Sequence, residues 1–60
     1  QLETVRDVVA DTILDNRSLG FDTTLATTAL NDGDSQRALG LYKAAYTRYR
    51  YAYQLAVRSR

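Results

Sequence analysis

The sequence predicts a small all-α protein, a three-helix hairpin or bundle, and three observations support this class. The 60 residues contain no Pro and only three Gly, and they are rich in Ala, Leu and Arg, which favour helices. Apolar residues recur at spacings of three and four, the period of a helix buried on one face. Two short segments that contain Gly interrupt this period. We therefore expect a single helical domain over residues 1–60, with two shorter helices packed along one long C-terminal helix.

The first predicted helix covers about residues 2–18. Val5, Val9 and Ile13 recur every four residues and form the apolar stripe of an amphipathic helix. Gly20 follows the last periodic residue, and we expect it to end the helix in the left-handed conformation.

The second predicted helix is short and covers about residues 23–31. Asp22 or Thr23 is the expected N-cap, and four apolar residues line one face: Leu25, Ala26, Ala29 and Leu30. The run Asn31-Asp32-Gly33 is typical of a turn, so we expect the helix to end there.

The third predicted helix covers about residues 35–58, with Asp34 or Ser35 as its cap. Tyr42, Tyr46, Tyr49 and Tyr53 follow one another at spacings of four, three and four, which is the seam of a heptad. We expect these four tyrosines to lie in a core. Because buried phenol hydroxyls require hydrogen-bond partners, either the edges of this core stay wet or the hydroxyls reach acids and Thr on neighbouring helices. Tyrosines of this kind also suit an interface.

Charge is divided between the two ends of the chain. Residues 1–34 contain seven acids and two bases, whereas residues 35–60 contain six bases and no acid. The formal net charge of +1 hides this division. Fields of opposite sign steer association, so we expect the chain to meet a partner, and each copy offers both signs to another copy.

One segment resembles a known family. Residues 25–46 read L-A-x-x-A-L-x-x-G-D-x-x-x-A-L-x-L-Y-x-x-A-Y. This is similar to the turn and second helix of a tetratricopeptide-type repeat, with Gly33-Asp34 at the turn and Ala38, Tyr42 and Ala45 at the small, aromatic and small positions of the second helix. The early aromatic and the closing Pro of that family are missing. The resemblance implies a protein-binding scaffold without catalysis.

Two groups of residues are candidates for contact with a partner. Tyr51, Leu55 and Ala44 form a small outward patch on the last predicted helix, between Arg48 and Arg50. On the first predicted helix, Asp7, Asp11 and Asp15 continue an acidic stripe that begins at Glu3 and runs opposite the apolar stripe. The acidic stripe is either a solvated face, a surface for a basic protein, or a set of ligands for a hard cation such as calcium.

The sequence indicates the class of function to which the chain belongs. The chain has no His, no Cys, no Gly-rich phosphate loop and no Ser beside a candidate base, so we expect neither an enzyme nor a cofactor. We expect a non-catalytic helical module that assembles with protein and forms a fragment or subunit of something larger. The alternative is a small basic helix that binds nucleic acid or another polyanion, because arginines and tyrosines alternate around Tyr51.

Overall fold

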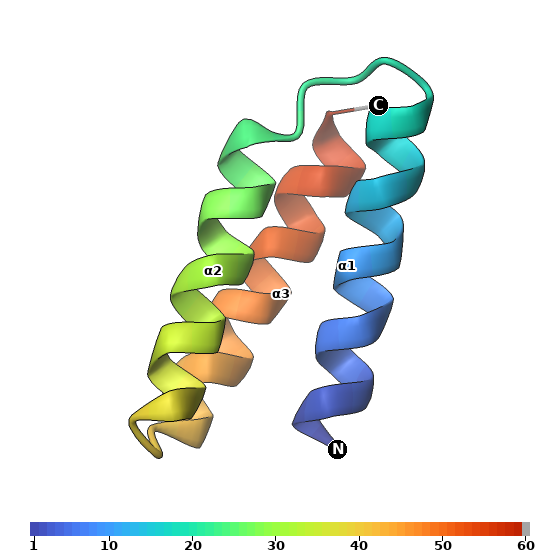
Figure 1. Cartoon of the computed structure of the whole chain (residues 1–60). Helices are drawn as coiled ribbons and strands as arrows, with labels where there is room; N and C mark the ends of the chain where they lie inside the picture. Colours follow the sequence, from blue (N-terminus) through green and yellow to red (C-terminus); the bar gives the residue numbers. More distant parts are fainter. Residues whose placement is uncertain (60) are drawn as a thin grey trace.

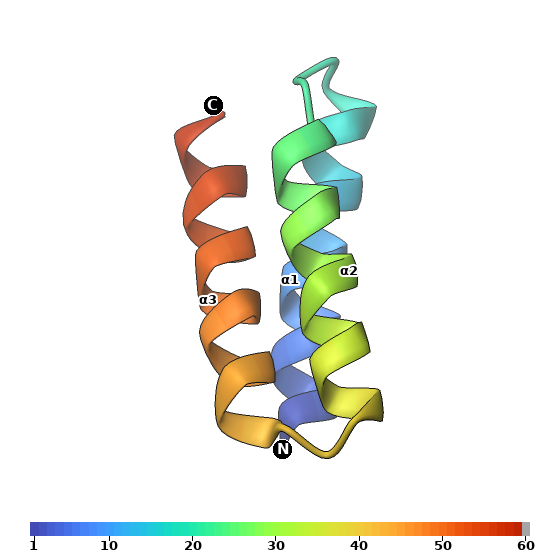
Figure 2. The ribbon, with the colours of Figure 1, turned by 90° about the vertical axis from the view of Figure 1, so that its left-hand side faces the viewer.

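The computed structural model describes residues 1–59, which form three helices and no strand. These are α1 (Leu2–Ser18), α2 (Thr24–Ala38) and α3 (Tyr42–Arg58), which lie side by side (Figure 1). The chain runs up α1, down α2 and up α3, so α1 and α3 are parallel (Figures 1 and 2). The predicted small all-α bundle is confirmed.

The second and third helices differ from the prediction in where they meet. The predicted turn at Asn31-Asp32-Gly33 is wrong, since α2 continues through it to Ala38 and α3 begins only at Tyr42. The three helices therefore have similar lengths of 17, 15 and 17 residues, rather than two short helices beside one long helix. Gly33-Asp34, which the tetratricopeptide resemblance places at a turn, lies within α2. Asp34 and Ser35 consequently cap no helix.

The two connections between helices have the same backbone geometry, which explains why α2 ends at Ala38. Gly20 and Gly40 both have positive φ, at 88° and 80°, and each directly follows a Leu that caps a helix. After each glycine, a backbone N–H reaches back to the helix: Phe21 donates to the Asn16 carbonyl and Leu41 to the Gln36 carbonyl, at 3.0 and 2.9 Å. Both ends are Schellman motifs, for which Gly is favoured. The left-handed end predicted at Gly20 is confirmed.

The core is made largely of small side chains. Its buried apolar members come from all three helices: Val9, Ile13, Ala26, Ala29, Leu30, Ala45, Tyr49, Ala52 and Ala56. Helix α3 packs most extensively on α2, less on α1, and α1 and α2 contact each other least. Alanines on both sides allow the α2 and α3 backbones to approach closely.

The expected core of four tyrosines is wrong for three of them. Tyr49 is fully buried, but Tyr42, Tyr46 and Tyr53 remain 62%, 45% and 44% exposed. A helix in a three-helix bundle buries one stripe, and Ala45, Ala52 and Ala56 occupy that stripe beside Tyr49. The other tyrosines are displaced to the flank of α3 that faces α1.

Candidate partner-binding surface

A polar triad, formed by Arg6, Asp34 and Tyr49, joins the three helices. The Arg6 guanidinium of α1 donates to both carboxylate oxygens of Asp34 in α2, from Nε to Oδ1 at 3.0 Å and from Nη2 to Oδ2 at 3.1 Å. The Tyr49 hydroxyl of α3 donates to the same Oδ1 at 2.6 Å. A two-pronged arginine–carboxylate contact fixes orientation as well as distance. The triad therefore sets the register of α1 against the α2–α3 pair.

Contacts within the polar triad shift the pKa values of its members. Hydrogen bonds from Arg6 are the main reason that the pKa of the Asp34 carboxyl lies below its usual value. Burial, and then the hydrogen bond to Asp34, raise the pKa of the Tyr49 hydroxyl to about 12. Asp34 is thus kept as the carboxylate acceptor and Tyr49 as the phenol donor.

Tyr49 reaches Asp34 because Gly33 leaves room for its ring. A methyl group built at Gly33 would lie 2.5 Å from Cε1 and 2.6 Å from Cδ1 of Tyr49. These separations are far inside van der Waals contact, so the ring lies directly on the backbone of α2. Gly33 is buried in the middle of a helix, where it provides close approach rather than a turn.

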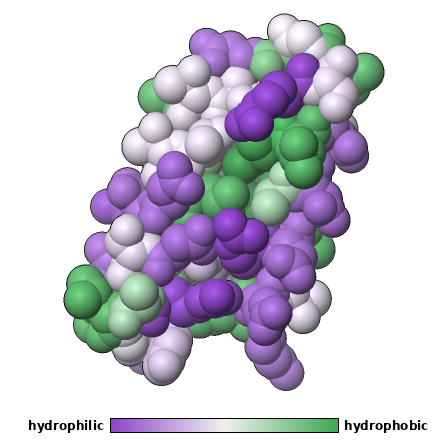
Figure 3. All heavy atoms as spheres, viewed as in Figure 1, coloured by the Kyte–Doolittle hydropathy of each residue, from purple (hydrophilic) through white to green (hydrophobic). Residues whose placement is uncertain are grey.

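Three further hydrogen bonds tie the C-terminal end of α1 to the rest of the chain. The buried Asn16 amide donates to the carbonyl of Ala56 in α3 at 2.6 Å. Arg17 donates to the hydroxyls of Thr23 and Thr27, each at 3.3 Å. Figure 3 shows the side between α1 and α2, where apolar side chains gather in the upper half and hydrophilic side chains cross above and below them.

A groove runs between α1 and α3 on the other side of the molecule. Two adjoining hollows that share Val5 run between α1 and α3. We call this the tyrosine groove and define it by Val5, Val8, Tyr42, Tyr46 and Tyr53, which line it.

The lining of the tyrosine groove is mainly apolar and, apart from the half-buried Val5, exposed. Val8 is 54% exposed, and the three groove tyrosines are exposed as given above. Arg50 also lines the groove, with its guanidinium carbon 5.9 Å from the centre of the Tyr46 ring. This geometry permits a cation–π contact that holds the arginine over the aromatic edge.

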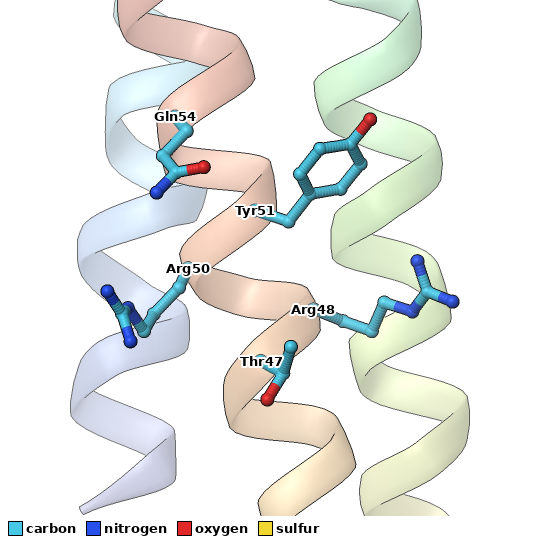
Figure 4. A pocket seen from close by; sticks show the side chains of 5 residues that line it. All are labelled: Thr47, Arg48, Arg50, Tyr51 and Gln54. Carbon is cyan, nitrogen blue, oxygen red and sulfur yellow. The ribbon is translucent and has the colours of Figure 1, made fainter.

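The patch predicted on α3 is only partly present. Ala44 and Tyr51 are exposed, whereas Leu55 is half-buried and packs against the core. Leu55 is therefore wrongly placed as an outward anchor, because it lies on the edge of the stripe that α3 buries against α2. Tyr51 lies in a shallow hollow with Arg48 and Arg50, as Figure 4 shows.

The two arginines of that patch do not converge on one point. In Figure 4, Arg50 extends towards the side of α1, whereas Arg48 and the ring of Tyr51 extend towards the side of α2. Residues two apart on a helix project about 200° from one another, which accounts for this divergence. Arg50 therefore belongs to the tyrosine groove and Arg48 to the other flank of α3.

The acidic stripe is present and faces outward. Glu3, Asp7, Asp11 and Asp15 are all exposed on α1. Within residues 1–59, none of them forms an ion pair with an arginine or lysine, the one such pair being Arg6–Asp34. In that same range no three carboxylates lie close enough to share a metal ion. The stripe and the basic residues of α3 thus remain separate surfaces of one molecule.

The sequence indicates that a core tyrosine could reach an acid on another helix, as Tyr49 does, but it identifies neither Arg6 and Asp34 as partners nor the position of the tyrosine groove. Arg6 is the one base in the first three turns of the first predicted helix, amid its acids, and it lies at the border of the apolar stripe. That position was a usable signal for a contact with another helix. The pairing of Arg6 with Asp34 does not follow from the sequence, because the turn signal beside Asp34 predicts a helix cap there. The groove does not follow either, because the heptad spacing predicts that all four tyrosines lie in the core.

No helix among residues 1–59 is both long and apolar enough to cross a membrane. No protein-family model, curated protein or solved structure matches the chain.

Proposed function

We propose that this chain is a non-catalytic helical assembly module that binds protein through the tyrosine groove. The observation that carries the proposal is the exposure of apolar and aromatic side chains along one side of two parallel helices. Isolated exposed apolar residues are ordinary, but a contiguous groove lined by them is typical of an interaction site. Tyrosine suits such a site because it combines a large apolar body with a polar tip.

The size of the chain supports the same proposal. A domain of 60 residues buries only about 60% of the surface of its unfolded chain, and such domains often depend on association, a disulfide or a metal. This chain has no cysteine and no histidine. Burial of Val8 and three tyrosines against a partner would add apolar area that the small alanine-rich core lacks.

Selection of binding peptides tests the proposal. Peptides chosen from a displayed random library against the wild-type chain are expected to lose binding to a Val8→Asp variant. Leu14→Asp is a matched control, because Leu14 lies on the same helix and is 56% exposed against 54% for Val8. Peptides that bind the two variants equally well, or that lose binding to Leu14→Asp as strongly as to Val8→Asp, would contradict a groove-based module.

The polyanion alternative rests on Tyr51 beside Arg48 and Arg50, and the geometry supports it less well. Single-strand binding requires bases to stack on aromatic rings within one basic track, whereas these arginines diverge. The test is binding of a fluorescent single-stranded oligonucleotide at several salt concentrations. Tight binding that weakens steeply with salt and disappears in an Arg48→Glu variant would favour this alternative.

A further inference from the structure

We infer that the occupant of the tyrosine groove is a second copy of this chain, related by a two-fold axis that runs along the helices. This inference rests on the proposed function and names its partner. It is argued from the distribution of charge on the two helices that border the groove, from their common direction, and from the dimensions of the face.

The two borders of the groove have opposite charge. On α1, the helical period places the exposed Asp7 and Asp11 next to Val8, outside the lining itself. On α3, Lys43 and Arg50 line the groove. Neither set forms an ion pair within residues 1–59. An isologous interface applies the same patch to itself, so a patch with one acidic and one basic border can be self-complementary.

Geometry selects one of the two face-to-face arrangements. Because α1 and α3 are parallel (Figure 1), an axis along the helices places α1 of one copy over α3 of the other, acid against base. An axis across the helices would instead place α1 over α1 and α3 over α3, which opposes like charges. The first arrangement is favoured, since like charges brought together across an interface are costly.

The register of this arrangement follows from the groove lining. Val8, Arg50 and Tyr53 line the same hollow, so they lie at the same height along the bundle. An axis parallel to the helices preserves height. Arg50 of one copy therefore comes opposite Asp7 and Asp11 of the other, and Val8 comes opposite Tyr53.

The available area is adequate for such a pair. The molecule measures 34 × 18 × 14 Å. Its long face is thus of the same order as the roughly 800 Å² per partner that a standard interface buries. The interface would place Tyr46, Tyr53 and Val8 at its centre and charges at its rim, the distribution found in specific interfaces.

Light scattering after size-exclusion chromatography tests the pairing. At about 0.05 M salt we expect a species of twice the 6.8 kDa chain mass, and a shift towards monomer at about 1 M salt, where the Debye length is near 3 Å. Asp7→Lys with Asp11→Lys, and separately Lys43→Glu with Arg50→Glu, should each give a monomer. An equimolar mixture of the two variants should restore a dimer, because every contact across the axis is then attractive. Asp32→Lys changes charge on exposed α2 and is expected to leave the dimer intact.

Cysteine cross-linking decides between the two axes. The chain has no native cysteine, so introduced thiols report only their own position. A mixture of Val8→Cys and Tyr53→Cys chains should form a mixed disulfide dimer, while Val8→Cys alone should not cross-link. Efficient cross-linking of Val8→Cys to itself would overturn the proposed axis.

The outcomes separate this inference from the function on which it rests. A folded monomer at both salts, with no restored dimer in the mixture, would overturn the second copy as occupant. If peptides still bound in a Val8-dependent manner, the groove would remain a protein-binding site for another partner. If they did not, both proposals would fail together.

Discussion

Helix α3 has two sides that are built from the same kinds of residue and behave differently. Towards α2, alanines and Tyr49 are buried, and the ring of Tyr49 lies against the backbone at Gly33. Towards α1, Tyr46 and Tyr53 remain nearly half exposed along the tyrosine groove. We call these the closed side and the open side of α3.

The difference between the sides comes from what each tyrosine meets. A glycine across the interface admits an aromatic ring at the depth of the backbone, and a carboxylate there satisfies its hydroxyl. On the open side, the tyrosines meet the valines of α1, which keep the ring at the edge. Burial of a residue in a thin bundle is therefore decided by the partner helix as much as by its own periodicity.

The largest expected loss of stability comes from removing the Tyr49 ring from the closed side. Tyr49→Ala removes a fully buried ring and leaves Asp34 without one hydrogen bond, which should cost about 3–5 kcal/mol in the free energy of unfolding. For a domain this small, that is of the order of its whole stability. Circular dichroism should show loss of helix at room temperature.

Tyr46→Ala is the matched control on the open side. It makes the same substitution on the same helix, and we expect a cost below about 1 kcal/mol because the ring is 45% exposed. Equal losses for the two variants would remove the distinction between the sides. All such measurements require one fixed protein concentration, since assembly adds to apparent stability.

The next largest effect is expected at Gly33, which leaves room for the Tyr49 ring on the closed side. Gly33→Ala gains about 1 kcal/mol of helix propensity, but the new methyl group must displace the Tyr49 ring. Overpacking of this kind typically costs about 1–3 kcal/mol, so we expect net destabilisation in urea unfolding. Ser35→Ala, on the exposed face of α2, should be neutral or slightly stabilising. A more stable Gly33→Ala would show that the ring can move without loss.

Alkaline unfolding sharpens the comparison through the Tyr49 hydroxyl. Its pKa is about 12 in the folded protein and 10.0 in an ordinary setting, so the folded state holds the proton more tightly. The corresponding stability is fully present below pH 10 and is lost as the pH rises towards 12. Unfolding of the wild type followed from pH 9 to 12 should show this loss, and Tyr49→Phe should lack that part of it. Parallel curves for the two proteins would contradict a buried, protonated Tyr49.

Acid unfolding tests the other member of the polar triad. The pKa of Asp34 is lowered in the folded state, so its contribution is present above the ordinary carboxyl pKa, near 4, and is lost as the pH falls through the lower folded value. We expect the stability difference between wild type and Asp34→Asn to shrink below pH 4. Asp32→Asn, exposed on the same helix, should differ little from wild type at any pH. A constant difference for Asp34→Asn would mean that its ion pair with Arg6 contributes nothing.

The parts of this fold that could be predicted are those that local chemistry determines. Val5, Val9 and Ile13 place α1, and Gly20 places its end, since both signals lie within one helix. The α2–α3 boundary was missed because Asn-Asp-Gly is a turn signal only when no tertiary contact competes with it. Here the packing of Tyr49 on Gly33 and the pairing of Asp34 with Arg6 hold the segment in a helix, and both depend on residues far away in sequence.

A local signal for the true boundary was nevertheless available. Arg17-Ser18-Leu19-Gly20 recurs as Arg37-Ala38-Leu39-Gly40, and both runs end a helix in the same motif. The candidate surface could be predicted only as far as single helices determine it. Outward positions on a helix follow from its period, and the expected exposure is confirmed for Asp7, Asp11, Asp15, Arg48 and Arg50. The groove between two helices depends on how they pack, which no single-helix pattern contains.

The smallest expected effect concerns Tyr51, whose ring is on neither side of the comparison. It is 45% exposed on the outer face of α3, so Tyr51→Ala should change the free energy of unfolding by less than about 0.5 kcal/mol. Leu55→Ala removes a half-buried side chain that packs on the core, and we expect a loss of about 1–2 kcal/mol. Urea unfolding of both variants at one protein concentration measures the contrast. If Tyr51→Ala cost as much as Leu55→Ala, the outer face of α3 would contribute as much to the folded state as the edge of the core does, contrary to the exposure of Tyr51.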